Sequence, residues 1–278
     1  MSAPLVTANG AAIPAIGLGT FKSTGDEGIK AVQAALAAGY RHIDTARMYG
    51  NETEVGEGLR SGGVPREQIF VTTKVWWEDI ADGALQASAE ASLKRLGLAQ
   101  VDLLLIHWPN PDVPLKDSIK ALCETKARGL TRHIGVSNFP VALLDEAVAL
   151  ASEPLVANQC EYHPLLDQSK VIAACRRHGM AFTSYCPIGR GALDKQPVID
   201  AIAAHHKKSV AQVVLRWHTQ QQGVVAIPKS ANPGRIAENL AIFDFTLSPD
   251  EMKAIHGLAR ADGRLIRPAF HPQWDEAA

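Results

Sequence analysis

One pattern recurs along the chain: an amphipathic, often alanine-rich segment ends at a glycine, and a short apolar segment follows it closely. The glycines in this position are Gly39, Gly97, Gly129, Gly179 and Gly223. A glycine after the last helical turn is the expected left-handed cap. Helix, cap and strand in repeated alternation predict a parallel β-sheet. The strands are continuous apolar runs, such as DLLLI at 102–106, which is typical of strands covered on both faces.

About eight such strands are predicted, and eight βα units in ~250 residues fit a closed (β/α)8 barrel, the TIM-barrel fold. The predicted strands are Ile16–Gly19, His42–Asp44, Ile69–Lys74, Val101–Ile106, Thr131–Val136, Leu155–Gln159, Ala181–Tyr185 and Val224–Ile227. The competing fold is an open, doubly wound sheet, whose dinucleotide-binding form carries GxGxxG after its first strand. Residues 17–22 read GLGTFK, with Lys22 in place of the third glycine, so that signature fails.

Two additions to the barrel are predicted. Residues 5–17 hold an Asn-Gly turn between apolar arms, which indicates an N-terminal β-hairpin that closes the bottom of the barrel. Residues 248–251, SPDE, have the order of a capping box and predict an extra C-terminal helix. Because no linker or low-complexity tract interrupts the chain, we expect residues 1–278 to form a single domain.

Composition narrows the class of partner. The net charge is −1 without a long run of one sign, which argues against nucleic acid and against an anionic membrane. The four cysteines form no CxxC pair, which favours a reducing compartment. The start, MSAPLVTANG, lacks a basic region and an apolar core, and no apolar run is long enough to span a membrane. We expect a cytoplasmic monomer that acts on a small molecule.

Polar residues follow the strands at their carboxyl ends, where barrel enzymes carry their catalytic groups. Asp44 ends one predicted strand with Tyr49 in the loop behind it, Lys74 ends the next, and His107 follows the third. Neighbouring strands lie about 4.8 Å apart, so these four side chains can meet in one pocket. The sequence therefore predicts a site that combines an acid, an ammonium, a phenol and an imidazole.

These four groups suit the reduction of a carbonyl. Free tyrosine has a pKa near 10, but an ammonium about 4 Å away stabilises tyrosinate by about 4 kcal/mol at an effective dielectric constant of about 20. We therefore expect Lys74, paired with Asp44, to lower the pKa of Tyr49, which then protonates a carbonyl oxygen that His107 orients. No group in the site attacks carbon, so a hydride from a nicotinamide is the expected reagent.

The chain resembles the aldo-keto reductase family, and within it the bacterial 2,5-diketo-D-gluconate reductase type. The resemblance runs from about residue 5 to the tail. It rests on GYRHIDTARMYGNE (39–52), IFVTTKVW (69–76), VDLLLIHWP (101–109), GVSNF (135–139), NQCEYHP (158–164), IPKS (227–230) and RIAENL (235–240). It implies a (β/α)8 barrel that binds NADPH without a dinucleotide fingerprint. The implied reaction is the reduction of small aldehydes, ketones or keto-sugars to alcohols, with Tyr49 as the proton donor.

The resemblance also implies the cofactor contacts. Those at the nicotinamide and the pyrophosphate are Ser137, Asn138, Gln159, Tyr185, Pro187 and Ile188. Those at the 2′-phosphate and the adenine are Lys229, Ser230, Arg235, Glu238 and Asn239. Two cations at the 2′-phosphate favour NADPH and make NADH the weaker cofactor. Related members often carry further basic residues where this chain reads ANPG at 231–234, which softens the preference.

For the substrate, the resemblance implies a mostly apolar wall around the polar site. Its predicted residues are Phe21, Met48, Trp76, Trp77, His107 and Trp108, with the tail Phe270–Trp274 closing the pocket.

Three other functions were weighed. Lys74 could form a Schiff base in an aldolase or lyase, but this requires a neutral amine, which Asp44 disfavours. A non-enzymatic nucleotide sensor usually loses a catalytic side chain, and all four are present here. A metal-dependent hydrolase could use His205 and His206, but beside Lys207 and Lys208 these indicate a solvated helical face, so no metal is predicted.

Overall fold

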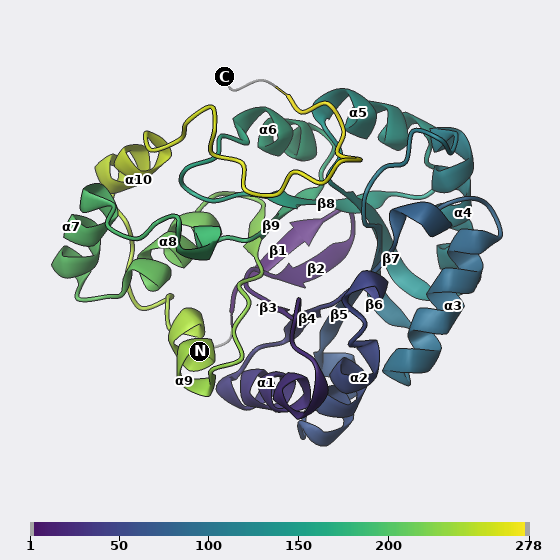
Figure 1. Cartoon of the computed structure of the whole chain (residues 1–278), viewed down its shortest axis with the longest axis horizontal. Coiled ribbons are helices and arrows are strands. Elements are labelled where there is room, and N and C mark those ends of the chain that lie inside the picture. Colours follow the sequence, from purple (N-terminus) through teal and green to yellow (C-terminus); the bar gives the residue numbers. More distant parts are fainter. Residues whose placement is uncertain (1–2, 276–278) are drawn as a thin grey trace.

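The computed structural model describes residues 3–275 and shows a barrel of parallel strands surrounded by helices (Figure 1). The strands of the barrel are β3 (Leu18–Gly19), β4 (His42–Asp44), β5 (Phe70–Val75), β6 (Val101–Ile106), β7 (Thr131–Ser137), β8 (Leu155–Glu161), β9 (Ala181–Tyr185) and β10 (Val224–Ala226). Each pairs in parallel with the next in chain order. The backbone N–H of Gly17 donates to the oxygen of Ala226 at 2.9 Å, and that of Gly19 to the oxygen of Pro228 at 3.0 Å, so the first and last strands meet. The predicted (β/α)8 fold and its eight strands are confirmed.

One helix follows each of the first six barrel strands, and two follow each of β9 and β10. The helices are α1 (Gly25–Ala38), α2 (Glu52–Ser61), α3 (Ala84–Leu96), α4 (Leu115–Ala127), α5 (Val141–Leu150), α6 (Ser169–Arg177), α7 (Pro197–His206), α8 (Val210–Thr219), α9 (Pro233–Leu240) and α10 (Pro249–His256). Short 3-10 turns are η1 (Arg47–Tyr49), η2 (Arg66–Gln68), η3 (Trp77–Asp79) and η4 (Gly189–Gly191). Helix α10 is the predicted extra helix, and Ser248 and Glu251 form its capping box. Within residues 3–275, no helix has the length and apolar character that a membrane crossing requires.

The N-terminal hairpin closes one end of the barrel, as predicted. Strands β1 (Leu5–Ala8) and β2 (Ala11–Pro14) pair in antiparallel fashion. At the turn, Asn9 Nδ2 donates to the carbonyl oxygen of Leu155, the first residue of β8, at 2.8 Å. It also donates to that of His178, which follows α6 shortly before β9, at 2.9 Å. Buried Ile13 packs with apolar side chains inside the barrel. The carboxyl ends of the strands therefore form the open end, where the predicted polar residues lie.

A buried histidine couples the stability of this fold to pH. His218 of α8 is fully buried, with Nδ1 2.8 Å from the oxygen of Val214 and Nε2 3.2 Å from that of Tyr162. Burial lowers its pKa to about 4, so the native protein binds fewer protons than the unfolded chain between pH 4 and the usual histidine pKa. The stabilisation is complete above about pH 6.5 and is lost as the pH falls towards 4, by on the order of 3 kcal/mol.

We expect the free energy of unfolding, measured with urea, to fall between pH 7.5 and pH 4.5. The variant His218→Gln, which keeps a donor but cannot titrate, should show a shallower dependence. An identical dependence in both proteins would show that another group controls the transition.

Candidate active site

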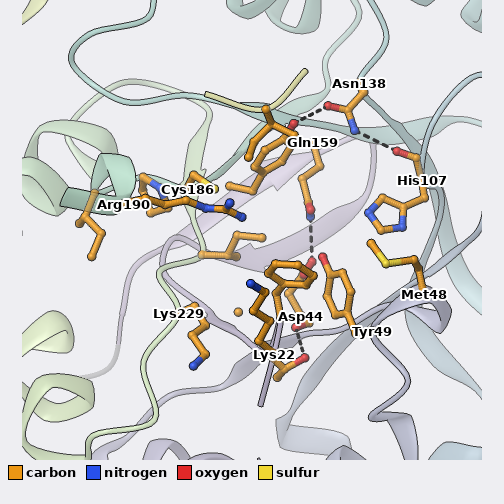
Figure 2. Close-up of a pocket in the computed structure, with 18 of the residues that line it drawn as sticks. Lys22, Asp44, Met48, Tyr49, His107, Asn138, Gln159, Cys186, Arg190 and Lys229 are labelled. Atoms are coloured by element: carbon orange, nitrogen blue, oxygen red, sulfur yellow. Dashed lines mark hydrogen bonds between the residues drawn. The ribbon is translucent and has the colours of Figure 1, made fainter. Parts of the chain in front are cut away.

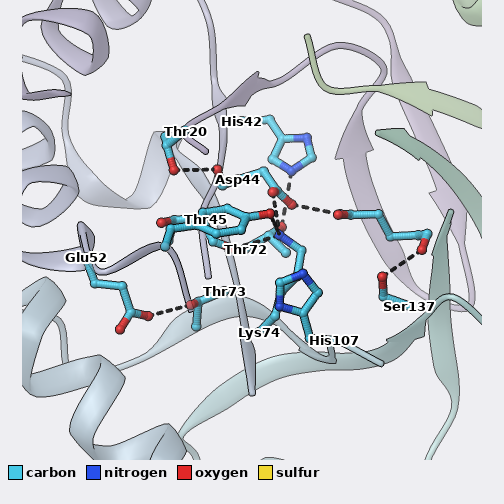
Figure 3. A network of polar contacts seen from close by, with 12 residues as sticks. Thr20, His42, Asp44, Thr45, Glu52, Thr72, Thr73, Lys74, His107 and Ser137 are labelled. Atoms are coloured by element: carbon cyan, nitrogen blue, oxygen red, sulfur yellow. Dashed lines mark hydrogen bonds and ion pairs between the residues drawn. The ribbon is translucent and has the colours of Figure 1, made fainter. Parts of the chain in front are cut away.

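The four predicted catalytic residues lie together at the open end of the barrel. Figure 3 shows three of them, Asp44, Lys74 and His107. Lys74, on β5, is fully buried, and its Nζ lies 2.5 Å from Asp44 Oδ1 at the end of β4. The same ammonium donates to the backbone oxygen of Thr45 at 2.8 Å and lies 3.5 Å from the hydroxyl of Tyr49 in η1. The parallel register places Asp44 beside Thr72, two residues before Lys74, so the pleat directs both side chains into the barrel. The predicted contact between phenol and ammonium is therefore present.

Asp44 is held at both of its carboxylate oxygens. While Oδ1 accepts from Lys74, Oδ2 accepts from Gln159 Nε2 at 2.8 Å. The backbone oxygen of Gln159 in turn accepts from Ser137 Oγ at 2.7 Å. A carboxylate fixed at both oxygens cannot rotate freely, so it keeps the ammonium aimed at Tyr49.

The charge on Lys74 is set by two opposing effects. Burial lowers its pKa, but the negative charge of Asp44, the contact with Tyr49 and the hydrogen bonds to both raise it, and the net result is a pKa above the usual value. Lys74 is therefore an ammonium at neutral pH. This argues against the Schiff-base alternative, which needs the free amine.

For Tyr49, the predicted direction of the pKa shift is wrong. The residue is half-buried and lines the cavity, yet the surrounding protein displaces water from the hydroxyl, and this loss of solvation raises the pKa of Tyr49 above its usual value. The attraction of Lys74 lowers it, as expected, but by less than burial raises it, and Asp44 adds a further upward shift. Tyr49 is therefore a neutral phenol at neutral pH and holds its proton firmly.

His107 follows β6 and faces Tyr49 across the site. Burial, and secondly the charge of Lys74, hold its pKa well below the usual value, so the imidazole is neutral. Its ring lies edge-on to Tyr49, with centroids 5.7 Å apart, and edge-on to Trp76 at 5.2 Å. The buried Nδ1 has no hydrogen-bond partner among residues 3–275.

A cavity of about 420 Å³ opens in front of these residues (Figure 2). Its lining includes twelve of the residues predicted for the site: Phe21, Asp44, Met48, Tyr49, His107, Trp108, Asn138, Gln159, Tyr185, Pro187, Ile188 and Lys229. Lys74 and Ser137 are buried behind this lining. The cavity therefore joins the polar cluster to the residues predicted to bind cofactor and substrate.

Other predicted cofactor residues lie outside this cavity, around the start of α9. Ser230 Oγ accepts from the backbone N–H of Asn232 at 3.2 Å. Arg235 is exposed, Glu238 is half-buried and Asn239 is buried. The predicted cofactor residues thus fall into two groups. One group lines the cavity and ends at Lys229, and the other, from Ser230 to Asn239, lies outside it.

Asn138 is already occupied by its neighbours. Its Nδ2 donates to the backbone oxygen of His107 at 2.9 Å and to Ser137 Oγ at 3.0 Å, and its Oδ1 accepts from the hydroxyl of Tyr185 at 2.8 Å. Only the second lone pair of Oδ1 is left for a ligand. Asn138 can therefore accept one more hydrogen bond but has no free amide proton to donate.

The aromatic wall is built by the three predicted tryptophans and the tail. Phe270 stacks on Trp77 at 4.5 Å and lies edge-on to Trp76 at 5.6 Å and Trp108 at 5.7 Å. Trp274 lies 6.0 Å from Trp108. Of the described residues, the cavity lining includes neither Trp76 and Trp77 nor Phe270 and Trp274, so the predicted closure of this cavity by the tail Phe270–Trp274 is not seen. Trp76 instead packs edge-on against His107, which does line the cavity.

A buried carboxylate fixes this tail. Glu161, at the end of β8, accepts hydrogen bonds from the backbone N–H groups of Leu265 at 2.6 Å and Ile266 at 2.9 Å. Ile266 lines the cavity, and the guanidinium of Arg264 lies 3.7 Å from the centre of the Trp274 ring. Sequence analysis did not assign a role to Glu161, since only the fold brings it to residues about a hundred positions away.

Sequence analysis also missed several lining residues: Gly19, Thr20, Lys22, Cys186, Arg190, Ile227 and Ile266. Two of them carry positive charge, and a signal existed for both. Lys22 occupies the place of the missing third glycine, and Arg190 follows Pro187 and Ile188 in the loop predicted to cross a pyrophosphate. The ammonium of Lys22 and the guanidinium of Arg190 each lie 5.6 Å from the centre of the Phe21 ring.

Comparisons with known proteins agree with this architecture. The sequence model of the aldo/keto reductase family matches residues 15–260. The methylglyoxal reductase DkgB of Escherichia coli O157:H7 is 41% identical over 268 residues, which cover 95% of this chain and 100% of the relative.

Two solved structures have the same fold. A candidate 2,5-diketo-D-gluconic acid reductase B superposes with a TM-score of 0.96 at 46% identity, covering 98% of both chains. The aldo-keto reductase of Bombyx mori, solved in complex with NADP, superposes with a TM-score of 0.87 at 36% identity, covering 93% of this chain and 94% of its own. On the extent of the sequence match, the shared barrel and these relatives, the chain belongs to the aldo/keto reductase family, a family of oxidoreductases that act on carbonyl compounds.

Proposed function

We propose that this protein reduces small aldehydes and ketones, keto-sugars among them, to alcohols with NADPH as the hydride donor and Tyr49 as the proton donor. The observation that carries the proposal is the buried ion pair of Lys74 and Asp44 set against Tyr49, with His107 opposite, at the inner end of an open cavity. We further propose that residues 1–278 act as one domain and as a monomer.

Each of the four residues has a distinct task. The reduced nicotinamide, when bound, supplies the hydride to the carbonyl carbon. Because His107 is neutral and its buried Nδ1 finds no acceptor, we place its proton on Nε2, where it can donate to the carbonyl oxygen. Tyr49 then donates its phenolic proton as negative charge develops on that oxygen.

The high resting pKa of Tyr49 is compatible with this role. A proton donor must carry its proton when the substrate binds, and the forming alkoxide is more basic than the carbonyl from which it arises. The ammonium of Lys74, 3.5 Å away, stabilises the tyrosinate that proton transfer leaves behind. Asp44 keeps that ammonium in place, so the lysine acts mainly on the product of the proton transfer.

Positive charge around the cavity supports an anionic cofactor. Lys22, Arg190 and Lys229 line it (Figure 2). The exposed Arg235 lies in the first turn of α9, a few residues after Lys229 in the chain. Phosphate groups favour such sites because each cation adds a charge-assisted hydrogen bond. The Bombyx mori relative was solved with NADP, which supports NADPH as the cofactor here. The methylglyoxal reductase relative supports a small carbonyl compound as the substrate.

The variant Arg235→Ala should weaken the binding of NADPH much more than the binding of NADH. A hydrogen bond to a charged group contributes about 1.5–3 kcal/mol, so we expect the Kd for NADPH to rise about 10–100-fold while the Kd for NADH stays nearly constant. Fluorescence titration with each cofactor measures both constants. Lys253→Ala, on α10, is the control for the loss of one positive charge, and equal weakening of both cofactors would place the 2′-phosphate elsewhere.

The proposed activity is tested by following NADPH oxidation with methylglyoxal, 2,5-diketo-D-gluconate and a series of aldehydes and ketones. Turnover with NADPH, and weaker turnover with NADH, is the expected result. If neither cofactor is consumed with any of these compounds although NADPH binds, the chain is a nucleotide-binding member without this activity.

A further inference from the structure

A cluster of two histidines and a glutamate lies on the outside of the barrel. His205 and His206 end α7, and Glu251 lies in the first turn of α10, which packs beside it (Figure 1). Glu251 Oε1 is 3.1 Å from His205 Nδ1 and 2.9 Å from His206 Nε2. One potential ligand atom from each residue lies within 4.8 Å of the other two.

This arrangement corrects the sequence-based view of the two histidines as a solvated face. The side chain of His205 is 74% exposed, but those of His206 and Glu251 are only 15% and 16% exposed. Glu251 is separated from the pair by some 45 residues of chain, so only the packing of α10 against α7 brings the carboxylate to the imidazoles.

We propose that His205, His206 and Glu251 bind one divalent transition-metal ion, with zinc as the reference ion, which joins α7 to α10. In a tetrahedral site with bonds of about 2.0–2.1 Å, ligand atoms lie about 3.3 Å apart, close to the two nitrogen–oxygen distances observed here. Each imidazole coordinates through the nitrogen that faces Glu251 Oε1, and a proton on that nitrogen moves to the other ring nitrogen or to solvent. Water completes the coordination on the exposed side of His205.

The ligand set selects the class of ion. Imidazole nitrogen suits zinc, copper and nickel, whereas magnesium and calcium prefer a shell made of oxygen ligands. A site with two imidazoles and one carboxylate oxygen therefore takes a first-row transition metal in preference to magnesium or calcium.

Neighbouring groups orient two of the three ligands. The other carboxylate oxygen of Glu251 accepts from the backbone N–H of Ser248 at 2.7 Å, which leaves Oε1 directed at the histidines. The ring of His206 packs on Phe245, with centroids 5.2 Å apart. Such outer contacts strengthen a metal site because they fix its ligands before the ion arrives.

The test is a titration of the metal-free full chain with zinc chloride, by calorimetry and by thermal unfolding. We expect one zinc ion per chain and a rise in Tm with zinc. His205→Ala removes an exposed ligand, and Glu251→Gln keeps an oxygen that can accept from Ser248. Loss of an outer contact alone weakens metal binding about 10–100-fold, so each of these variants should lose at least about 100-fold in affinity.

His178→Ala is the matched control. His178 pairs with Asp145 at 2.6 Å, so it is a histidine–carboxylate pair without a second histidine. This variant should bind zinc as the unaltered protein does. Cobalt gives an independent readout, since its visible absorption reports coordination by nitrogen, and this band should vanish in His205→Ala.

The proposal is overturned if the unaltered protein binds no zinc, or if His205→Ala and His178→Ala bind zinc with equal affinity. Unfolding of each variant without zinc shows whether the fold is intact. If Glu251→Gln fails to fold, His205→Ala and the cobalt spectrum decide the outcome alone.

Discussion

Replacing Tyr49 with phenylalanine should lower kcat for carbonyl reduction about 10²–10⁴-fold, the usual contribution of a positioned proton donor. The change deletes only the hydroxyl that lies 3.5 Å from Lys74 Nζ and keeps the ring that packs edge-on against Phe21 and His107. Cofactor affinity and the free energy of unfolding should therefore change little. Steady-state kinetics with a saturating carbonyl measures kcat, and a cofactor titration measures the Kd.

The matched control is Tyr40→Phe. Tyr40 is a buried tyrosine outside the cavity, and its hydroxyl donates to the backbone oxygen of Ile236 at 3.2 Å. This variant loses a hydroxyl of the same kind and should keep its kcat.

The pH profile of the unaltered protein gives a second check. Because the pKa of Tyr49 is raised, kcat should stay flat from about pH 6 to about pH 9. Wild-type turnover in Tyr49→Phe, where chemistry limits the rate, would remove Tyr49 from the mechanism.

Replacing Asp44 with asparagine should have the largest effect on stability, a loss of about 3–5 kcal/mol in the free energy of unfolding. The side chains of Lys74 and Asp44 are 0% and 1% exposed, so the variant leaves an ammonium in the interior without its counter-charge. Activity should fall as well, because the lysine then loses either its charge or its position beside Tyr49. Chemical denaturation measures the first effect and steady-state kinetics the second.

The double variant Asp44→Asn, Lys74→Met distinguishes an unpaired charge from a simple loss of packing. Methionine fills part of the space of lysine without carrying charge, so the double variant should be more stable than Asp44→Asn alone, while activity stays low. If the losses of stability in Asp44→Asn and in Lys74→Met simply add in the double variant, the ion pair does not couple the two residues, and Asp44 does not stabilise the charge of Lys74.

The barrel and the four residues around its open end could be predicted because their signals are local. The glycine that ends α1 has a φ of 108° and the one that ends α3 a φ of 66°, so both adopt the left-handed conformation that the sequence indicated. Parallel strands place their carboxyl ends at one end of a barrel, so finding Asp44, Lys74 and His107 at strand ends was enough to predict that they meet. Asp44 and His107 line one cavity, and Lys74 is buried behind its lining.

The direction of the pKa shift at Tyr49 could not be predicted in this way. Sequence analysis counted the attraction of Lys74, which is a pairwise effect between two recognisable residues. The opposing effect is the loss of water around the hydroxyl, to which every atom packed near it contributes. A short sequence motif does not reveal how many such atoms the fold will bring together. For the same reason, the occupied amide protons of Asn138 and the anchoring of the tail by Glu161 were missed.

By itself, the sequence determined which segments become strands and helices, which polar residues stand at the strand ends, and which family the chain resembles, since each is encoded in short runs of residues. Only the tertiary structure decided how much water each site residue retains, which side chains are already occupied by neighbours, and that Glu251 meets His205 and His206. These properties depend on contacts between segments far apart in the chain, which exist only once the helices have packed around the barrel.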